Sequence, residues 1–139
     1  MKVHQDTVAV RTSGRGLLDV TKRVQQVVEA SGIETGLCTV FLQHTSASLV
    51  IQENADPAVL RDLESWIARV APEDPRAYEH DDEGPDDMPA HLRASMTKTS
   101  EVVPITKGRL ALGTWQAIYL WEHRGTPHTR TLVVHLQGT

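Results

Sequence analysis

The sequence has 139 residues, 40% of which are hydrophobic, and this length supports one domain with its own core but not two. The formal net charge is -4 at pH 7, and eight of the eighteen acidic residues fall between Pro72 and Asp87, where Arg76 is the single base. The remainder is only mildly basic, which excludes the clustered Lys and Arg of a nucleic-acid-binding surface and favours a small phosphorylated metabolite as partner, and no run approaches the ~18 apolar residues of a membrane span.

The first half of the chain predicts strands around one helix. Residues 2–10 alternate enough to form a strand. Asp19 can then cap a helix that ends at Gly32, because valines recur at helical spacing between these two residues. Residues 36–52 are rich in β-favouring types, and they predict either one long bent strand or two strands joined near residues 45–48.

Cys38 is the only cysteine, so it has no partner for a disulfide within the chain. Its apolar neighbours Leu37, Val40 and Phe41 favour a buried thiol in a reducing compartment. The first residues, MKVHQDTVAV, lack the apolar core of a signal peptide. We therefore expect a cytoplasmic protein.

The second half begins with a helix and ends with strands. Asn54 or Asp56 supplies a cap and Pro57 the first residue of an amphipathic helix, which should end before Pro72. The acidic segment follows, and then a short helix around His91. The remaining strands are expected at residues 101–105, 113–121 and 129–136.

Strands outnumber helices and are separated by turns as well as by helices. This arrangement favours a single α+β domain over residues 1–139, with a mainly antiparallel sheet, two main helices and one short helix. Neither GxGxxG nor a GxxxxGKS or GxxxxGKT motif is present, so the usual backbone cradles for dinucleotides and nucleoside triphosphates are missing.

The stretch from His80 to Ser95 holds two histidines and five carboxylates around a Gly-Pro break. A merely solvated acidic loop would supply the carboxylates without the histidines. It would also not place His91 one turn into a helix opened by Asp87 and Pro89. Because unusually long loops in small domains tend to be functional, we expect this one to be an ordered wall of a site.

Two further histidines lie where strand patterns end. His44 precedes small hydroxyl residues that let a ligand approach the backbone, although alone it is also typical of a strand histidine bonded to a carbonyl. His123 lies just before a turn. Three histidines from separate segments can form a metal site with an open position for water or substrate. A serine hydrolase is disfavoured, since Ser46 and Ser48 lack the GxSxG elbow.

Six motifs are specific enough to compare with a known family: HTSASL, NADP, HDDEGPDDMPAH, PITKGRLALGTWQ, EHR and LQG. Together they resemble the YjbQ-like family, whose members are described as secondary thiamine-phosphate synthases. The resemblance covers nearly the whole chain and is most specific over residues 100–118. It implies a small α+β fold that assembles as a homotrimer, with polar sites close to subunit contacts. The implied activity joins a pyrimidine diphosphate to a thiazole phosphate and releases pyrophosphate.

The resemblance also guides the choice of candidate site residues. His80 is the substitute for the third metal ligand, while Asp86 or Asp87 would orient a ligand histidine or hold the metal's water. The metal would be zinc or magnesium. Relatives often carry a glycine- and serine-containing turn before a pair of basic residues, and this chain departs from that pattern at residues 125–129, GTPHT. Only Arg130 keeps the basic character of a phosphate clamp. The candidates are, for the metal, His44, His91 and His123; for catalysis, His80, Asp86 and Asp87; and for substrate binding, Glu53, Asn54, Trp115, Gln116 and Arg130.

Two other classes of function share this pocket. One is a metal-dependent hydrolase of a small phosphorylated or damaged metabolite, and the other is a non-catalytic trimer that binds a metal or an anion. The metal hypothesis predicts that His91→Ala and His44→Ala each remove bound metal. The trimer is expected to draw interface area from Trp115, Tyr119 and Trp121 in the apolar C-terminal part.

Overall fold

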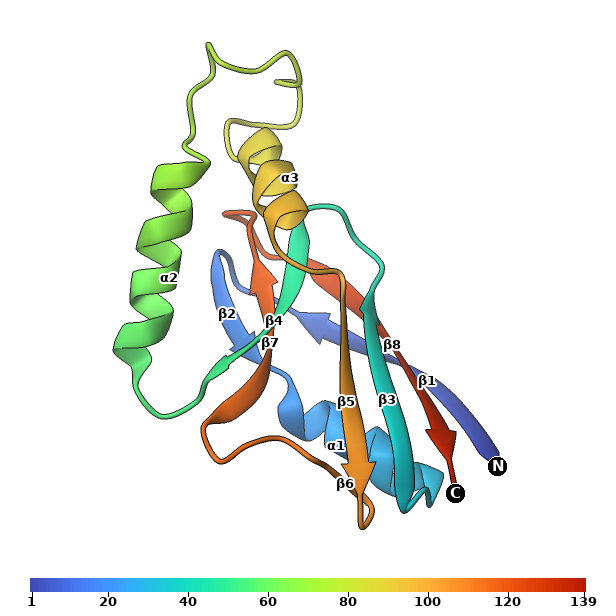
Figure 1. The fold of residues 1–139 in the computed structure, drawn as a ribbon. Coiled ribbons are helices and arrows are strands. Elements are labelled where there is room, and N and C mark those ends of the chain that lie inside the picture. The colour runs from blue at the N-terminus through green and yellow to red at the C-terminus, as the bar shows by residue number, and fades with distance from the viewer.

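The alternating apolar residues near the C-terminal end form an interior strand of a five-stranded sheet in the computed structural model, which describes residues 1–139 (Figure 1). Leu132, Val134 and Leu136 point to one side of their strand and are fully buried. All strand pairs are antiparallel, with the order β1-β8-β3-β5-β6 in the larger sheet and β2-β7-β4 in the smaller one. The predicted α+β class with three helices is confirmed.

The elements follow one another without a long interruption until the acidic loop. The first half comprises β1 (Lys2–Arg11), β2 (Gly16–Asp19), α1 (Thr21–Ser31), β3 (Thr35–Leu42) and β4 (Ala47–Glu53). The second half comprises α2 (Pro57–Val70), α3 (Asp87–Met96), β5 (Ser100–Thr106), β6 (Arg109–Leu110), β7 (Gln116–Glu122) and β8 (Thr129–Gly138).

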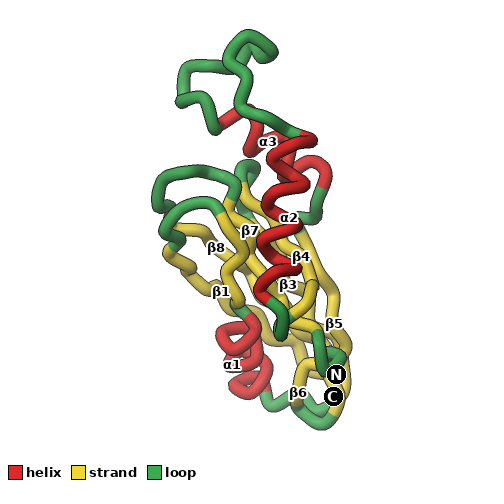
Figure 2. The backbone as a smooth tube through the Cα atoms, turned by 90° about the vertical axis from the view of Figure 1, so that its left-hand side faces the viewer, coloured by secondary structure: helices red, strands yellow, loops and turns green.

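α1 lies at one end of the molecule, where it contacts strands of both sheets, whereas α2 and α3 contact strands of the smaller sheet (Figure 2). In α1 the helically spaced valines predicted to face the core do so, and Gly32 ends the helix with a φ of 69°, a conformation that glycine adopts without steric cost. α2 begins as expected, because the Asp56 side chain accepts a hydrogen bond from the Ala58 amide and Pro57 occupies the first turn. Only Ile67 of α2 is fully buried, so this helix packs loosely.

The observed strands differ from the predicted ones in two respects, and they decide between the two alternatives left open for residues 36–52. Residues 36–52 form two strands, β3 and β4, which belong to different sheets. The two short strands β2 and β6 were not predicted. The strand expected at residues 113–121 starts at Gln116, because Gly113 belongs to a turn: its carbonyl accepts from the Gln116 amide, and its own amide donates to the Gln116 side chain at 2.7 Å.

Cys38 lies on the inner face of β3 with no exposed area, which confirms the predicted buried thiol. Burial raises the pKa of this thiol to about 12, so it stays protonated and unreactive at neutral pH. Tyr119 and Trp121 are likewise buried within the chain, whereas Trp115 is 63% exposed. Of the three aromatic residues expected to supply interface area, only Trp115 is therefore available for that role. None of the helices has the length and apolar character needed to cross a membrane.

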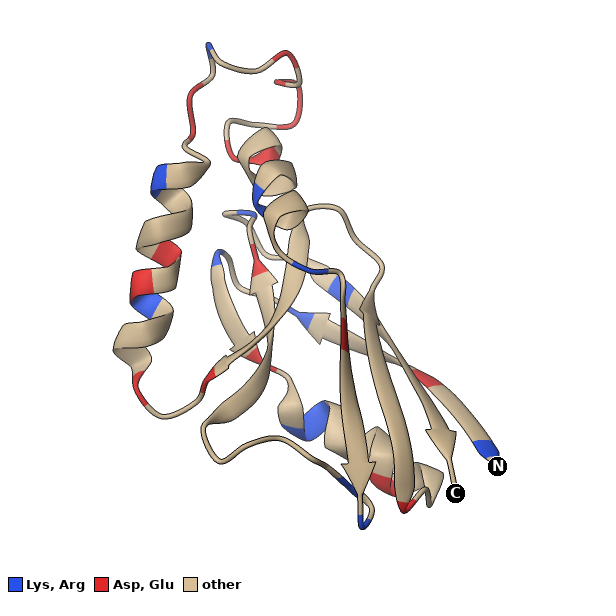
Figure 3. Cartoon of the chain, viewed as in Figure 1, with Lys and Arg blue, Asp and Glu red and all other residues tan.

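The acidic loop joins α2 to α3 at one end of the molecule, where Figure 3 shows its carboxylates gathered. It contains its own turns: the Ala77 amide donates to the Asp74 carbonyl at 3.0 Å, and the Tyr78 hydroxyl donates to the Pro72 carbonyl at 2.8 Å. These contacts order the first part of the loop, and the contact between His80 and Asp87 joins its second part to the first turn of α3, where the candidate site lies.

Candidate metal centre

His80, Asp87 and His91 come together at the start of α3, and their ligand atoms lie within 4.8 Å of one another. Asp87 is the first residue of α3, and His91 follows four residues later, so helical geometry places both on one face. His80 reaches the same carboxylate from the acidic loop. Its Nε2 lies 2.7 Å from Asp87 Oδ2, and His91 Nε2 lies 3.1 Å from that oxygen.

The hydrogen bonds of His91 determine which of its ring nitrogens can bind a cation. Nδ1 lies 2.9 Å from the Thr45 carbonyl, which only accepts, so Nδ1 carries a hydrogen. In a neutral ring the lone pair is then on Nε2 and faces the negatively charged oxygen of Asp87. Such a contact is unfavourable unless a proton or a metal ion lies between the two atoms. Histidines that bind metals commonly donate their other ring N–H to a backbone carbonyl in this way.

Asp87 is held in place from its other oxygen. Its side chain is only 2% exposed, and Oδ1 forms an ion pair with Arg124, with Nη1 at 2.9 Å. Burial alone would raise the pKa of Asp87, but the hydrogen bond from His80 and the positive charge of Arg124 act against it, and the pKa is lowered. Asp87 is therefore ionised at neutral pH, and its Oδ2 is presented to the two histidines.

Asp86 positions Arg124 without touching the histidines. Its Oδ2 accepts from Arg124 Nε at 3.1 Å and from the Gly125 amide at 2.7 Å, and Arg124 also donates to the Glu83 carbonyl. Burial would raise the pKa of Asp86, but the Gly125 amide and the Arg124 guanidinium lower it. Arg124 was not among the predicted site residues, and its only signal in the sequence is its place in the EHR motif.

His80 is the most accessible member of the cluster, with its side chain 41% exposed. The hydrogen bond to Asp87 raises the pKa of His80, and the nearby charges of Asp82 and Glu83 act in the same direction. The His91 side chain is 30% exposed. Two histidines and one carboxylate with solvent on one side form a ligand set that suits zinc or another divalent transition metal and leaves coordination positions for water or substrate.

His44 belongs to a different cluster, which centres on Arg130. Its Nε2 accepts from the Thr131 amide at 2.8 Å, and its Nδ1 lies 3.4 Å from Arg130 Nη1. Burial and the charge of Arg130 lower the pKa of His44, so the ring is neutral. With one nitrogen used by the backbone and the other beside a cation, the ring offers no free ligand atom toward His91.

Arg130 is itself paired with a buried acid. It bonds both carboxylate oxygens of Glu122, which is 1% exposed, and it donates to the hydroxyl of Ser46 at 3.0 Å. The Thr12 hydroxyl donates to the same carboxylate at 2.7 Å. Burial would raise the pKa of Glu122, yet the bonds from Arg130 and Thr12 lower it. The predicted phosphate clamp is thus a neutralised, buried ion pair.

His123 also lies outside the metal cluster. Its side chain is fully buried, Nε2 lies 2.8 Å from the Ser48 hydroxyl, and Nδ1 has no partner. Burial, reinforced by the charge of Arg93, lowers the pKa of His123 to about 3. The ring is neutral over the physiological range, and it packs against Trp121 with the ring centroids 5.2 Å apart.

The remaining predicted substrate residues form a group at the far end of the β4–β7 pair. Glu53 pairs with Gln116 at that end, whereas Ala47 pairs with Glu122 at the other, about 20 Å away along the strand. Asn54 donates to the carbonyls of Thr114 and Gln116 and its amide donates to the Trp115 carbonyl. Within one chain, Glu53, Asn54, Trp115 and Gln116 do not meet the histidine cluster.

Comparison with known proteins places this geometry in a family. The family model described as UPF0047 protein YjbQ-like matches residues 6–139. A UPF0047 protein from Synechocystis sp. is 56% identical over 135 residues, which cover 97% of this chain and 92% of that protein. The UPF0047 protein YjbQ from Escherichia coli O157:H7 is 43% identical over 136 residues, which cover 97% of this chain and 98% of that protein.

The fold comparison agrees with the sequence comparison. A crystal structure of a YbjQ-like protein of unknown function from Sulfolobus solfataricus P2 has a TM-score of 0.90 and 32% sequence identity, and the match covers 99% of each chain. A crystal structure of a YjbQ/UPF0047 family protein from Clostridium acetobutylicum has a TM-score of 0.86 and 36% identity, covering 95% of this chain and 99% of that one. The chain belongs to the UPF0047/YjbQ-like family.

Proposed function

We propose that the chain is a metal-assisted enzyme acting on a small phosphorylated metabolite. Its leading activity is the transferase reaction that joins a pyrimidine diphosphate to a thiazole phosphate, giving thiamine phosphate and pyrophosphate. One observation carries the proposal: the bond from His91 Nδ1 to the Thr45 carbonyl leaves Nε2 facing the same Asp87 oxygen that His80 contacts. Zinc or magnesium held by His80, Asp87 and His91 would supply positive charge to a diphosphate leaving group.

The arginines of the site support the need for an ion. Arg124 is balanced by Asp86 and Asp87, and Arg130 by Glu122, so neither guanidinium has free charge for a diphosphate. Loss of a diphosphate depends chiefly on positioning and charge neutralisation, and no protein nucleophile is needed. In this scheme Asp87 is the carboxylate ligand between the two histidines, and Arg124 holds it in place and ionised.

The exposure of the histidine side chains also favours a second function, a metal-dependent hydrolase. His80 and His91 are open enough for water to reach the cluster. The two activities differ in the acceptor: the transferase releases pyrophosphate only when both thiamine precursors are present, whereas the hydrolase turns over a single phosphorylated substrate with water. Tight binding of metal or anion without any turnover would instead support the non-catalytic binding protein.

The metal is tested first by removal and reloading. After treatment with chelator and addition of zinc, we expect the parent protein to retain about one ion per chain, and His91→Ala and His80→Ala to lose it while remaining folded. His128→Ala is the matched control, because this histidine lies in the turn before β8 and bonds only the Thr126 carbonyl through its ring. Parent-like zinc content in both cluster variants would refute the metal site.

We also propose that the chain forms a homotrimer. Four large apolar side chains share the outer face of the five-stranded sheet. Leu37 lies in the same row as Val3, and Phe41 lies two strand periods further along β3. Val102 is paired with Thr39, which lies between Leu37 and Phe41. Their exposed fractions range from 42% for Leu37 to 64% for Val3. Such a patch commonly marks an interface. Light scattering should give the mass of three chains, and a monomer at micromolar concentration would remove the proposal.

A further inference from the structure

Helix α2 carries a row of apolar side chains that the rest of the chain covers only in part. Its members are separated by four, three and four residues, which places them on one side of the helix: Val59, Leu63, Trp66 and Val70. Trp66 is 45% exposed and Val70 is 48% exposed, while the other two are half-buried. We call this row the α2 stripe. Apolar residues that are merely scattered over a surface do not share one helix face, so the stripe indicates a contact surface.

The face of α2 that contacts the three-stranded sheet is a different one. It is marked by Ile67, the fully buried residue of the helix, and by Glu64, which accepts a hydrogen bond from the Trp121 indole. At about 100° per residue, the middle of the α2 stripe lies roughly a quarter of a turn around the helix from this face. In Figure 1, α2 stands at the left edge of the molecule, with the three-stranded sheet between it and β8. The stripe is thus separate from the apolar patch on the five-stranded sheet to which the trimer is assigned.

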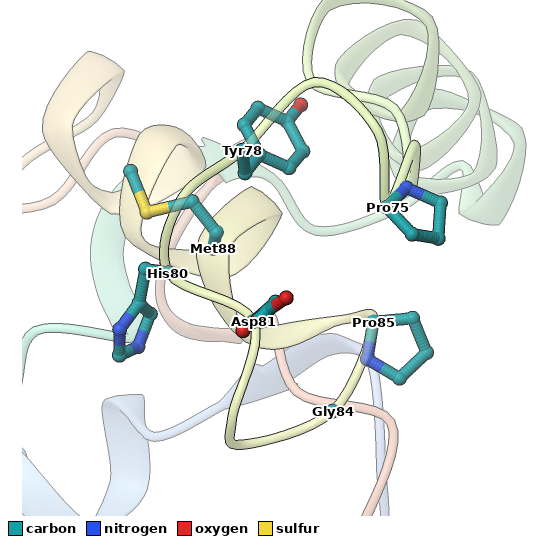
Figure 4. A pocket seen from close by; sticks show the side chains of 7 residues that line it. All are labelled: Pro75, Tyr78, His80, Asp81, Gly84, Pro85 and Met88. Atoms are coloured by element: carbon teal, nitrogen blue, oxygen red, sulfur yellow. The ribbon is translucent and has the colours of Figure 1, made fainter.

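The acidic loop follows α2 in the sequence, but it does not cover the stripe. Its apolar side chains Pro75 and Tyr78 line a cavity of about 280 Å³ together with Met88 of α3 (Figure 4). They therefore face one another and α3. Trp66 and Val70 lie in the half of α2 that leads into this loop, and they remain about half exposed. The occupant of the stripe must come from outside the chain.

Two charged residues lie beside the α2 stripe, on its side away from the three-stranded sheet. Asp62 and Arg69 are exposed, and neither belongs to an ion pair within the chain. They are about 10 Å apart along the helix, which is too far for direct contact. An occupant of the stripe therefore meets one negative and one positive charge at its rim. A second copy of α2 presents the same two charges at the same spacing, and it can pair with both.

The orientation of such a helix pair follows from the stripe and its charges. In an antiparallel pair, Leu63 of one copy packs against Trp66 of the other, and the two valines at the ends of the stripe also meet. Asp62 of each copy then lies opposite Arg69 of the other, so a two-fold axis forms this ion pair twice. A parallel pair would place Asp62 beside Ile67 and form no ion pair. We propose that the α2 stripe binds the α2 stripe of a second copy of this chain in the antiparallel orientation, which joins two trimers through their outer helices.

The first test measures the mass of the full-length protein by light scattering as its concentration is raised. One pair of helices makes a small interface, so the mass should double with a midpoint at about 100 µM. Trp66→Glu places a charge in the middle of the stripe and should keep the lower mass up to about 1 mM. Ser65→Glu is the matched control, because it adds the same charge to a neighbouring exposed residue outside the stripe. Its mass should double as that of the parent does.

The second test exchanges the charges beside the stripe. Asp62→Arg brings two positive charges together in the antiparallel pair, and Arg69→Asp brings two negative charges together. Each variant should raise the midpoint concentration about tenfold, because two ion pairs are replaced by two repulsive contacts. The double variant restores opposite charges, and its midpoint should return to within about threefold of the parent. These exposed positions decide the question even when Trp66→Glu fails to fold.

Three results would overturn the proposal: a parent mass that stays constant over the whole range, a Ser65→Glu variant that does not double, or a double charge variant as weak as the two single ones. The outcome is separable from that of the trimer. A rise from three chains to six supports both assemblies, whereas a rise from one chain to two supports the helix pair and removes the trimer. A constant mass of three chains overturns the helix pair and leaves the trimer standing.

Discussion

Two clusters in this chain each combine arginine, carboxylate and histidine side chains, and they differ in how many oxygens of the carboxylate the arginine contacts. In the buried cluster Arg130 bonds both oxygens of Glu122, and both side chains are at most 4% exposed. In the cluster at α3, Arg124 takes only one oxygen of Asp87 and leaves the other to His80 and His91. We call the first cluster closed, because both carboxylate oxygens are used by the arginine. We call the second cluster open, because one carboxylate oxygen and two histidine nitrogens remain available to bind a metal ion from solvent.

The difference teaches that a list of histidines and acids does not locate a metal centre. His44 lies next to a neutralised ion pair and uses its ring nitrogen to accept a backbone hydrogen bond. His91 uses a backbone carbonyl to keep its other nitrogen available. A histidine whose ring nitrogen accepts a backbone hydrogen bond is thus structural, whereas one whose ring donates to a backbone carbonyl keeps its other nitrogen free for a metal ion. Mutation of each histidine, followed by zinc titration, tests this distinction.

The largest effect is expected from breaking the closed cluster. Glu122→Gln leaves the buried Arg130 without its counter-charge, and we expect the free energy of unfolding to fall by about 3–5 kcal/mol. Urea denaturation measures this change. Glu29→Gln, which alters an exposed carboxylate on α1, is the control and should stay within about 0.5 kcal/mol of the parent. A loss below about 1 kcal/mol for Glu122→Gln would mean that the pair is not structural.

The second effect concerns acid stability and His123. Its folded pKa of about 3 lies below the ordinary value of 6.5, so the unfolded chain binds more protons in that interval. Stability should therefore fall as the pH drops from 6.5 toward 3, by up to about 4 kcal/mol from this residue. His123→Gln should flatten the pH profile of the urea midpoint, while His128→Gln should not. Parallel profiles for His123→Gln and the parent would contradict the assigned burial effect.

The third effect concerns the role of Arg124 in the open cluster. Arg124→Gln releases the second oxygen of Asp87, so the carboxylate loses its orientation and zinc affinity should fall by about 10–100-fold. Arg124→Lys keeps the positive charge but cannot contact Asp86 and Asp87 through two separate nitrogens as the guanidinium does. Its zinc affinity should therefore lie between that of Arg124→Gln and that of the parent. Calorimetric titration with zinc measures all three proteins. Tighter binding by Arg124→Gln would show that removing the positive charge outweighs the lost orientation.

The smallest effect separates the two clusters most directly. His44→Ala should leave zinc affinity at the parent level, although the residue was selected from the sequence as a ligand, because its ring faces Thr131 and Arg130. The measurement is the same zinc titration, with His91→Ala as the variant that loses binding. Equal losses in His44→Ala and His91→Ala would return His44 to the metal centre.

Local spacing accounts for the parts that were predicted well. The valine periodicity of α1, the Asp56-Pro57 start of α2 and the alternation of β8 each depend on residues close in sequence. The nearness of Asp87 and His91 also follows from helical spacing. Sequence reasoning therefore located the acidic segment and the start of α3 as a candidate site.

Long-range pairing accounts for what was missed. Arg124 reaches Asp86 across 38 residues, and His44 meets Thr131 across 87. Such neighbours are set by the register of β3 and β8 and by the turn after β7, and no local pattern encodes them. The prediction that His44 and His91 bind the same metal ion used residue type alone. Their surroundings distinguish them, and these surroundings exist only once the sheets have formed.

The position of β8 has a consequence for the order of folding. This strand holds the last residues of the sequence, yet it lies between β1 and β3, and Lys2 is paired with Gly138. During synthesis β3 can pair with β5, but β1 has no neighbour to pair with until residues 129–138 leave the ribosome. Contacts across more than a hundred residues make such a sheet slow to form. The nascent chain thus passes through a stage in which the buried face of β1 lacks the strand that joins it to the rest of the sheet.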